Sequence, residues 1–405
     1  MKKYLKLFLC FFLTLLPSLP LWAVDFGFVL DQTAGFGGYG TDGKFDYSGM
    51  AIPRFSTLVG DNGSLFISAG FRADYQYQVA DYQYKNWILM PELLRTEFSW
   101  HFGAGQITVG RMQYSDPLGF IANGLFDGAR VSLETTAGTF SAGAWYTGLL
   151  YKLRANIAMT DREVEANNIK PDYTHFSDTY FAPRRIVSAL SWEHPELGQL
   201  FRVNIDLLGQ FDVSGYTPLN TQYAVAKVAF PWDAFVFNLG GSFEMKEVSG
   251  DTGIGLAGEL GAAWALPTTF ESRLSLLGRF TSGVVANSSV DAFLPVTTEL
   301  QGDILQAKLS ALSVISLDYT ARLTQALSAG ISSSYFVRSD LATYSDYGNN
   351  GYFLGNEFFA ALFWNPFTDI QVNLGGGVFL PSLGNAAPDG ENLWRIALNV
   401  ILALY

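Results

Sequence analysis

The sequence predicts an all-β protein, a transmembrane antiparallel up-and-down β-barrel. Three observations predict it: long stretches that alternate between apolar and polar residues, an aromatic content of 15% that equals the charged content, and short turns that alternate with longer connections. No segment after the N-terminus offers the roughly 20 consecutive apolar residues that a membrane-spanning helix needs. A chain this apolar must therefore hide its apolar side chains by alternation.

Alternation is clearest at the C-terminus and recurs near residues 65–76, 201–210 and 370–380. Period two is typical of a strand with one apolar and one polar face. Each stretch runs for about ten residues, which suits a tilted strand crossing a bilayer. The alternative, a soluble β-sandwich, usually has strands of only about 5–6 residues. Five tryptophans fall near strand ends beside a short turn, where membrane barrels carry an aromatic girdle: Trp100, Trp192, Trp232, Trp264 and Trp364.

The number of connections predicts the number of strands. Longer connections, the largest being 154–182 and 282–305, separate the short turns. Eight turns and nine longer connections predict about 18 strands, with 16 as the nearest alternative. An even number puts both chain ends on the periplasmic side and lets the last strand pair with the first, so that no edge is unpaired in lipid. The short turns are expected near 61–63, 103–105, 136–138, 195–198, 231–233, 267–268, 322–325 and 365–368.

The N-terminus predicts export. Lys2 and Lys3 precede an apolar run from Leu5 to about Leu16, and cleavage is expected after Ala23, as in a secretory signal peptide. We therefore expect residues 1–23 to be removed and residues 24–405 to form a single barrel domain in the cell outer membrane. Cys10 is the only cysteine, so the mature chain is expected to have no disulfide.

The inward face of the predicted strands is rich in charge, which favours a water-filled interior because burying unpaired charges costs several kcal/mol each. Four arginines come from neighbouring strands near mid-height, and Arg111 joins them if a bulge at Gly110 turns it inward. Acidic residues lie farther round the barrel. One hypothesis is a basic wall facing a partly acidic one; the other is that paired charges only solvate and stiffen the wall. The predicted pore-lining residues are Arg54, Arg72, Arg95, Arg111, Arg130, Asp206, Glu244 and Glu259.

Two segments, VGRMQY at 109–114 and FDGARV at 126–131, resemble a G-R-x-x-Y strand and the strand after it in outer-membrane porins. They also resemble the 18-stranded alginate-export type. In porins the arginine of that strand lines the constriction, and the resemblance implies this role for Arg111. The connection 115–125 is expected to lack the long inward fold of general porins.

These observations predict a porin that passes small polar solutes or ions by passive diffusion, without a cofactor and without enzymatic activity. His175 and Ser177 have an H-x-S spacing similar to that of outer-membrane phospholipase, but they fall in a polar loop. Strand-like alternation begins at Val24, which leaves no room for a plug domain. Outer-membrane lipids and the barrel-assembly machinery are expected partners, with a homo-oligomer as one option.

The long connections leave another function open. An adhesin or receptor would act through loops 154–182 and 283–304, although the first of these could instead fold into the pore as a constriction. Much of the net charge of −12 is expected on these loops, and an acidic rim would repel nucleic acid. Solvated outer loops are the simpler expectation for both.

Overall fold

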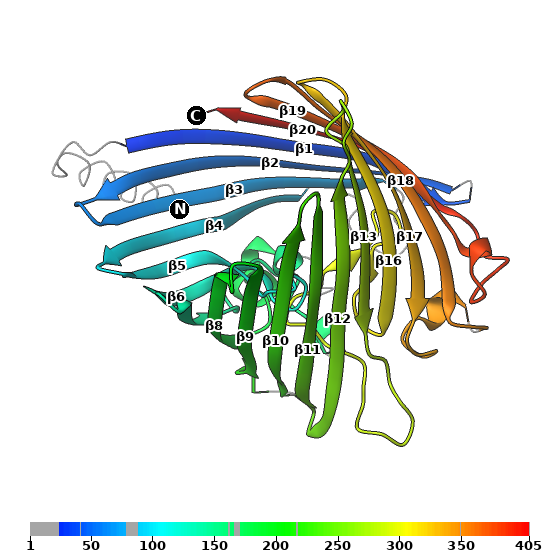
Figure 1. The fold of residues 1–405 in the computed structure, drawn as a ribbon, viewed down its shortest axis with the longest axis horizontal. Helices are drawn as coiled ribbons and strands as arrows, with labels where there is room; N and C mark the ends of the chain where they lie inside the picture. Colours follow the sequence, from blue (N-terminus) through cyan, green and yellow to red (C-terminus); the bar gives the residue numbers. More distant parts are fainter. Residues whose placement is uncertain are drawn as a thin grey trace.

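The computed structural model describes residues 24–40, 42–77, 88–160, 163–165, 171–215, 218–348 and 350–404. The predicted leader, residues 1–23, lies outside these ranges. Eighteen strands form one sheet, and each strand pairs antiparallel with the next one along the chain (Figure 1). The first and last strands also pair, from Phe28 opposite Leu404 to Tyr39 opposite Leu393. The predicted 18-stranded, closed up-and-down barrel is therefore confirmed.

The barrel strands differ in length. A small two-stranded ribbon, β14 (Leu300–Gln301) with β15 (Ala307–Lys308), lies in the connection 282–311, outside the barrel sheet. The barrel strands are β1 (Val24–Tyr39), β2 (Asp42–Val59), β3 (Gly63–Tyr77), β4 (Ile88–Phe102), β5 (Gly105–Ser115), β6 (Asn123–Thr135), β7 (Gly138–Tyr146), β8 (Arg185–Leu197), β9 (Phe201–Asp212), β10 (Leu219–Trp232), β11 (Phe235–Val248), β12 (Asp251–Ala265), β13 (Arg273–Thr281), β16 (Leu312–Arg322), β17 (Leu327–Arg338), β18 (Phe353–Phe367), β19 (Ile370–Leu380) and β20 (Leu393–Leu404).

Helical structure is confined to the connections. Within the described ranges no helix is long and apolar enough to cross a membrane. The short helices are α2 (Lys152–Ala155), η2 (Tyr173–His175), α4 (Phe176–Thr179), η3 (Ser345–Tyr347) and η4 (Pro381–Leu383).

The two ends of the barrel differ in their connections. One end, here called the turn end, holds eight short turns, each overlapping a predicted one, together with the start of β1 and the end of β20. The opposite end, the loop end, holds the long connections, but two of its connections have only two residues each. They lie at 40–41 and 249–250, where Gly40 and Gly250 have positive φ angles of 53° and 93°, as tight hairpins require. The expectation that long and short connections alternate strictly is wrong at these two places.

The outward and inward faces follow the predicted alternation. On β20, Ile396 is 55% exposed on the outer face, whereas Arg395 points inward and pairs with Asp46 of β2 at 2.8 Å. The five tryptophans of the predicted girdle lie toward the turn end of β4, β8, β10, β12 and β18. Trp192 donates its indole N–H to the Ala137 carbonyl of the neighbouring turn. The outer surface therefore has the apolar strand faces and aromatic ends of a membrane barrel.

Parts of several connections fold into the barrel instead of staying outside it. Residues 116–122, 150–158 and 292–311 contribute buried apolar side chains to one core, together with inward residues of β5 to β19. Phe120 reaches across the lumen, because the Arg279 guanidinium of β13 lies 5.3 Å from its ring. The expectation of solvated outer loops is therefore wrong for these parts, and the seven-residue connection 116–122 also folds inward, as a short segment. The apolar side chains of these segments explain the inward folding, because exposing them to water would lose the free energy gained by burying apolar surface.

Candidate solute pathway

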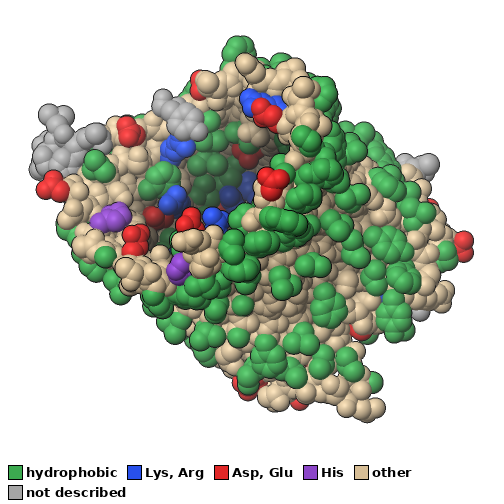
Figure 2. Space-filling model, viewed as in Figure 1, with side chains coloured by type: hydrophobic (Ala, Val, Ile, Leu, Met, Phe, Trp, Pro, Cys, Tyr) green, Lys and Arg blue, Asp and Glu red, His purple; other side chains and the backbone are tan. Residues whose placement is uncertain are grey.

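The inner wall of β2 to β4 carries three of the predicted pore-lining arginines. Arg72 and Asp74 of β3 pair at 2.7 Å, with both side chains partly exposed. Arg95 of β4 pairs with Glu97 at 2.6 Å and keeps 46% of its side chain exposed. Arg54 of β2 lies flat on the wall over Gly27 of β1, where a Cβ atom would collide with it. Figure 2 shows a hollow bordered by basic and acidic side chains.

Arg130 of β6 faces a separate, polar cavity of about 180 Å³ in the lumen. It donates a hydrogen bond of 3.1 Å to Ser141 Oγ. Asn204 also lines the cavity, and its Oδ1 atom is buried without a hydrogen-bond partner in the described part of the chain. A buried acceptor of this kind usually marks a place for water or a polar solute.

Two of the three predicted acidic residues face protein instead of open lumen, whereas Asp206 lines the small polar cavity together with Arg130. Asp206 is 5% exposed and accepts a hydrogen bond of 2.6 Å from the Tyr114 hydroxyl. Glu259 is 5% exposed and pairs with Lys227 at 2.7 Å and with Arg279 at 3.0 Å. Glu244 is fully buried under the inward connection and accepts the Leu294 N–H at 3.0 Å. The placement of Glu244 and Glu259 as pore-lining residues is therefore corrected, because an inward segment covers Glu244 and two cations pair with Glu259.

Arg111 is also misplaced by the sequence. Gly110 does have a positive φ of 117°, and a Cβ atom there would collide with the Thr96 carbonyl. The guanidinium nevertheless lies within the barrel wall, 5% exposed, and makes two hydrogen bonds of 2.8 and 2.7 Å to Asp127. The porin resemblance implied that Arg111 lines a constriction. Arg111 instead lies in the wall at the last residue pair before β4 and β5 separate, so the constriction role does not fit this position.

Two acids that sequence reasoning did not single out hold the inward segments in place. Asp116 accepts the backbone N–H groups of Leu118, Gly119, Ile121 and Ala122 at 2.8 to 3.1 Å. Glu357 accepts three more, from residues 303–305. An Asp followed by Pro and Gly is a recognisable turn pattern, so Asp116 could have been predicted as a local cap. The role of Glu357 depends on a connection 52 residues away in sequence and left no local pattern.

The residues considered for catalysis do not form a nucleophile–base pair. His175 Nδ1 faces Asp172 at 3.1 Å, while Ser177 Oγ bonds to Asp178. In the described ranges, no group of three or more His, Cys, Asp or Glu residues is placed to hold a metal ion.

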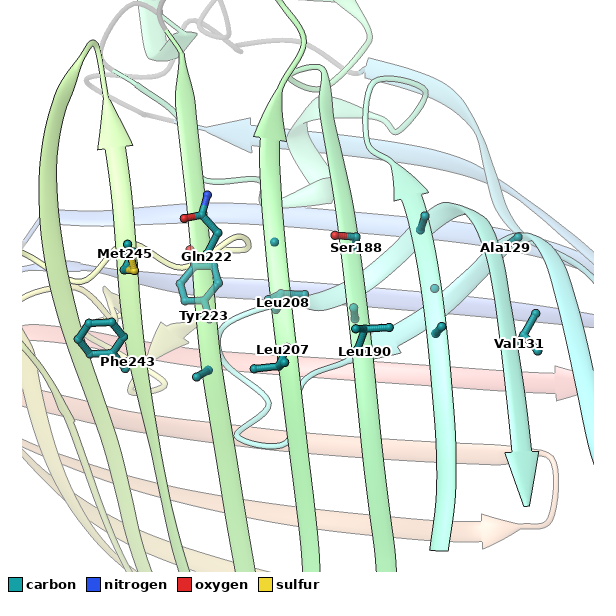
Figure 3. Close-up of a pocket in the computed structure, with 16 residues that line it drawn as sticks. Ala129, Val131, Ser188, Leu190, Leu207, Leu208, Gln222, Tyr223, Phe243 and Met245 are labelled. Atoms are coloured by element: carbon teal, nitrogen blue, oxygen red, sulfur yellow. The ribbon is translucent and has the colours of Figure 1, made fainter. Parts of the chain in front are cut away.

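The outer face carries a shallow apolar groove across β6 to β11. Small residues such as Ala129 and Ser188 form its floor, and Leu190, Leu207 and Phe243 form its sides (Figure 3). The residues of this groove alternate with the inward ones along the same strands. It therefore belongs to the apolar outer surface and is separate from the solute pathway.

Comparison with known proteins identifies structural relatives only. No family model and no curated protein matches the sequence. The structure is similar to OccK2 (OpdF) of Pseudomonas aeruginosa, with a TM-score of 0.63 and 12% identity, covering 94% of this chain and 98% of that one. It is also similar to OccK9 (OpdG) of the same organism, with a TM-score of 0.62, 9% identity and coverages of 94% and 99%.

Further similar structures support the same fold. Acinetobacter baumannii OccAB4 has a TM-score of 0.60 and 9% identity, with coverages of 94% and 97%. OpdK of Pseudomonas aeruginosa is described as an outer membrane protein, and one OccK2 structure is a complex with glucuronate. At these identities the similarity shows the fold alone, which confirms the prediction of a porin-like barrel at the level of architecture.

Proposed function

We propose that this protein is an outer-membrane porin through which small polar solutes or ions diffuse passively. One observation carries the proposal: a closed barrel with an apolar outer surface has partly exposed ion pairs along the inner wall of β2 to β4. Exposed, paired charges on the inside of a membrane barrel are expected where water fills the lumen. The similarity to OpdK, an outer membrane protein, supports the location.

The inward segments give this pathway its course. They cover the loop-end half of the inner wall from β5 to β19, so a solute would travel along β1 to β4. We propose Arg54, Arg72 and Arg95 as the residues that contact it there, and Arg130 as a residue that contacts water or solute in the separate polar cavity beside β6. We further propose that residues 1–23 are a cleaved leader, that residues 24–405 are the mature domain, and that the barrel-assembly machinery inserts it.

The alternative function, an adhesin or receptor, has less support. Parts of loops 154–182 and 283–304 pack inside the barrel, with Ile157, Phe293 and Val296 buried at 3% exposure or less. Side chains that form a core inside the barrel are not available to a partner outside the cell.

Single-channel conductance in planar bilayers tests the proposed porin. We expect discrete conductance steps from the refolded protein. Asn399 faces the lumen, where it donates to Asp31 Oδ1 at 2.6 Å, and the adjacent Leu398 is 43% exposed on the outer face. Asn399→Trp should lower the conductance by blocking part of the lumen, whereas Leu398→Trp should leave it unchanged. An absence of conductance steps would sink the porin proposal and favour a surface-binding role.

A further inference from the structure

The barrel wall is split between β4 and β5 toward the loop end. Strand β4 pairs with β3 along nearly its whole length, from Ile88 to Trp100. It pairs with β5 only from Thr96 to Phe102. On the β5 side, residues 88–95 therefore present an edge that no strand of the described residues covers. Two pieces of the connection after β7, residues 149–156 and 172–181, contact this edge and are here called the wedge.

Along the free edge of β4, backbone carbonyl groups accept hydrogen bonds from side chains instead of from a neighbouring strand. The Leu89 carbonyl accepts from the Tyr173 hydroxyl, and the Pro91 carbonyl accepts from the Tyr180 hydroxyl, the latter at 2.9 Å. The Leu93 carbonyl accepts from Arg111. Pro91 itself has no N–H group to leave unpaired, which suits an edge position. The seam between the strands is thus closed by three side-chain donors in place of a continuous hydrogen-bond ladder.

Arg111 holds together the turn-end side of the seam. Besides its pair with Asp127 of β6, its guanidinium donates to Leu93 of β4 and to the Leu149 carbonyl of the wedge, the latter at 3.0 Å. One side chain of β5 therefore joins two other strands and the wedge. Toward the loop end, side-chain contacts join the wedge to β4. These contacts can separate without breaking the hydrogen-bond ladder of the sheet.

The turn-end part of the seam lies at membrane height. Leu93 is seven residues before Trp100 in β4, which is about 23 Å along a strand at ~3.3 Å per residue. A strand tilt of about 40° makes this roughly 18 Å of height, within an apolar band about 25 Å tall. An opening near Leu93 would therefore connect the lumen with the bilayer, whereas Leu89, eleven residues before Trp100, lies at roughly 28 Å, at the outer border of that band.

The interior of the seam is apolar, unlike the charged wall beside it. Met90 of β4, Tyr151 and Tyr180 are buried together, with Phe176 packed against them. The Tyr151 and Tyr180 rings stack at 4.8 Å, and those of Phe176 and Tyr180 at 4.3 Å. A charged solute would gain nothing there, whereas an alkyl or aromatic group would find favourable surfaces.

We propose that this seam is a lateral gate, through which small apolar or amphipathic molecules pass between the lumen and the bilayer. The wedge is the segment that moves. Arg111 is the positioning residue that limits the opening on its turn-end side. The inference assumes the membrane location of the proposed porin, and adds a second route beside its polar pathway. The ion pair of Arg154 with Glu92, at 3.3 Å, lies at the lumenal side of the wedge.

The test locks the gate and measures entry of an apolar probe. Leu89 and Tyr173 are both 61% exposed, so Leu89→Cys and Tyr173→Cys can be joined by a short bis-maleimide in cells that carry the protein in their outer membrane. The probe is N-phenyl-1-naphthylamine, an uncharged dye that brightens on entering a bilayer. A matched control joins Leu207→Cys to Ala224→Cys, which lie directly opposite each other in a fully paired region. Single-channel conductance of each cross-linked protein is recorded in parallel.

We expect the seam cross-link to remove most of the protein-dependent dye entry, while the control cross-link changes nothing. The double variant Tyr173→Phe and Tyr180→Phe removes two of the three donors and should raise entry several-fold. Dye entry that is independent of the protein, or equally sensitive to both cross-links, overturns the gate. The conductance of the locked protein separates the two proposals. If the protein conducts but the seam cross-link does not reduce dye entry, only the porin proposal stands. If the seam cross-link reduces dye entry but the protein shows no conductance, only the gate proposal stands.

Discussion

Two parts of the inner wall carry similar alternating charges and place them in opposite surroundings. On β3 and β4, Arg72 and Arg95 retain 29% and 46% side-chain exposure beside their acidic partners. On β9 to β12, Asp206, Glu244 and Glu259 are 5% exposed or less. The strands themselves are alike, and the difference comes from what covers the second part: a folded-in connection over Glu244, the Tyr114 side chain beside Asp206 and two cations beside Glu259. An inward charge in a barrel strand can therefore line the water pathway or hold a folded-in loop.

Removing the anchor of an inward segment should have the largest effect. In Asp116→Ala, the buried N–H groups of Leu118, Ile121 and Ala122 lose their acceptor, and each unsatisfied group costs about 1–3 kcal/mol. We expect residues 116–122 to leave the lumen and the single-channel conductance to rise. Asp116→Asn keeps one acceptor oxygen and should give a smaller rise. Unchanged conductance in the alanine variant would show that this segment does not limit the pathway.

Reversing charges on the exposed part should change ion selectivity. Arg72→Glu combined with Arg95→Glu places four acids where two ion pairs stood. We expect the reversal potential in a salt gradient to shift toward cation preference, because the local potential becomes negative. Glu259→Gln, on the buried part, is the control and should shift it little. If the double variant kept the wild-type selectivity, the arginines would only solvate the wall.

On the buried part, removing a polar group should change the stability of the protein instead of its ion selectivity. Tyr114→Phe deprives the buried Asp206 carboxylate of its hydroxyl donor, which should lower the free energy of unfolding by about 1–3 kcal/mol. Urea unfolding of the refolded protein measures this change. Tyr335→Phe is the matched control, because its hydroxyl makes only an exposed bond of 3.3 Å to Leu383. Equal losses in both variants would contradict the distinction between the two parts.

The smallest expected effect is a pH dependence at the loop end. Burial favours a raised pKa for Asp340, but N–H donors from Thr343, Val284 and Ala342 and the Thr343 hydroxyl hold the pKa below its ordinary value. A lowered folded-state pKa stabilises the protein above the unfolded-state pKa of about 3.9, and this stability is lost as pH falls through the folded-state pKa. The free energy of unfolding should thus decrease in acid, and Asp340→Asn should weaken that decrease. An identical pH profile in the variant would assign the effect to other acids.

Much of the barrel could be predicted from local sequence patterns. Period-two alternation assigned residues such as Ile396 and Arg395 to opposite faces, and turn patterns located the eight short turns. These features depend on neighbouring residues, which is why 18 strands and the closed sheet followed from the sequence. The alternation rule also placed most inward charges on the inner face of the wall.

Only the tertiary structure decided which of those charges meet water. Phe120 packs under Arg279 from the opposite side of the barrel, and Glu357 binds backbone N–H groups of a distant connection. Arg111 shows the same limit, since its position depends on the parting of β4 from β5 and on the Leu149 carbonyl. The sequence by itself determined the wall, because strand periodicity is local. The course of the pathway was decided by contacts between segments far apart in the chain, and no local pattern records those.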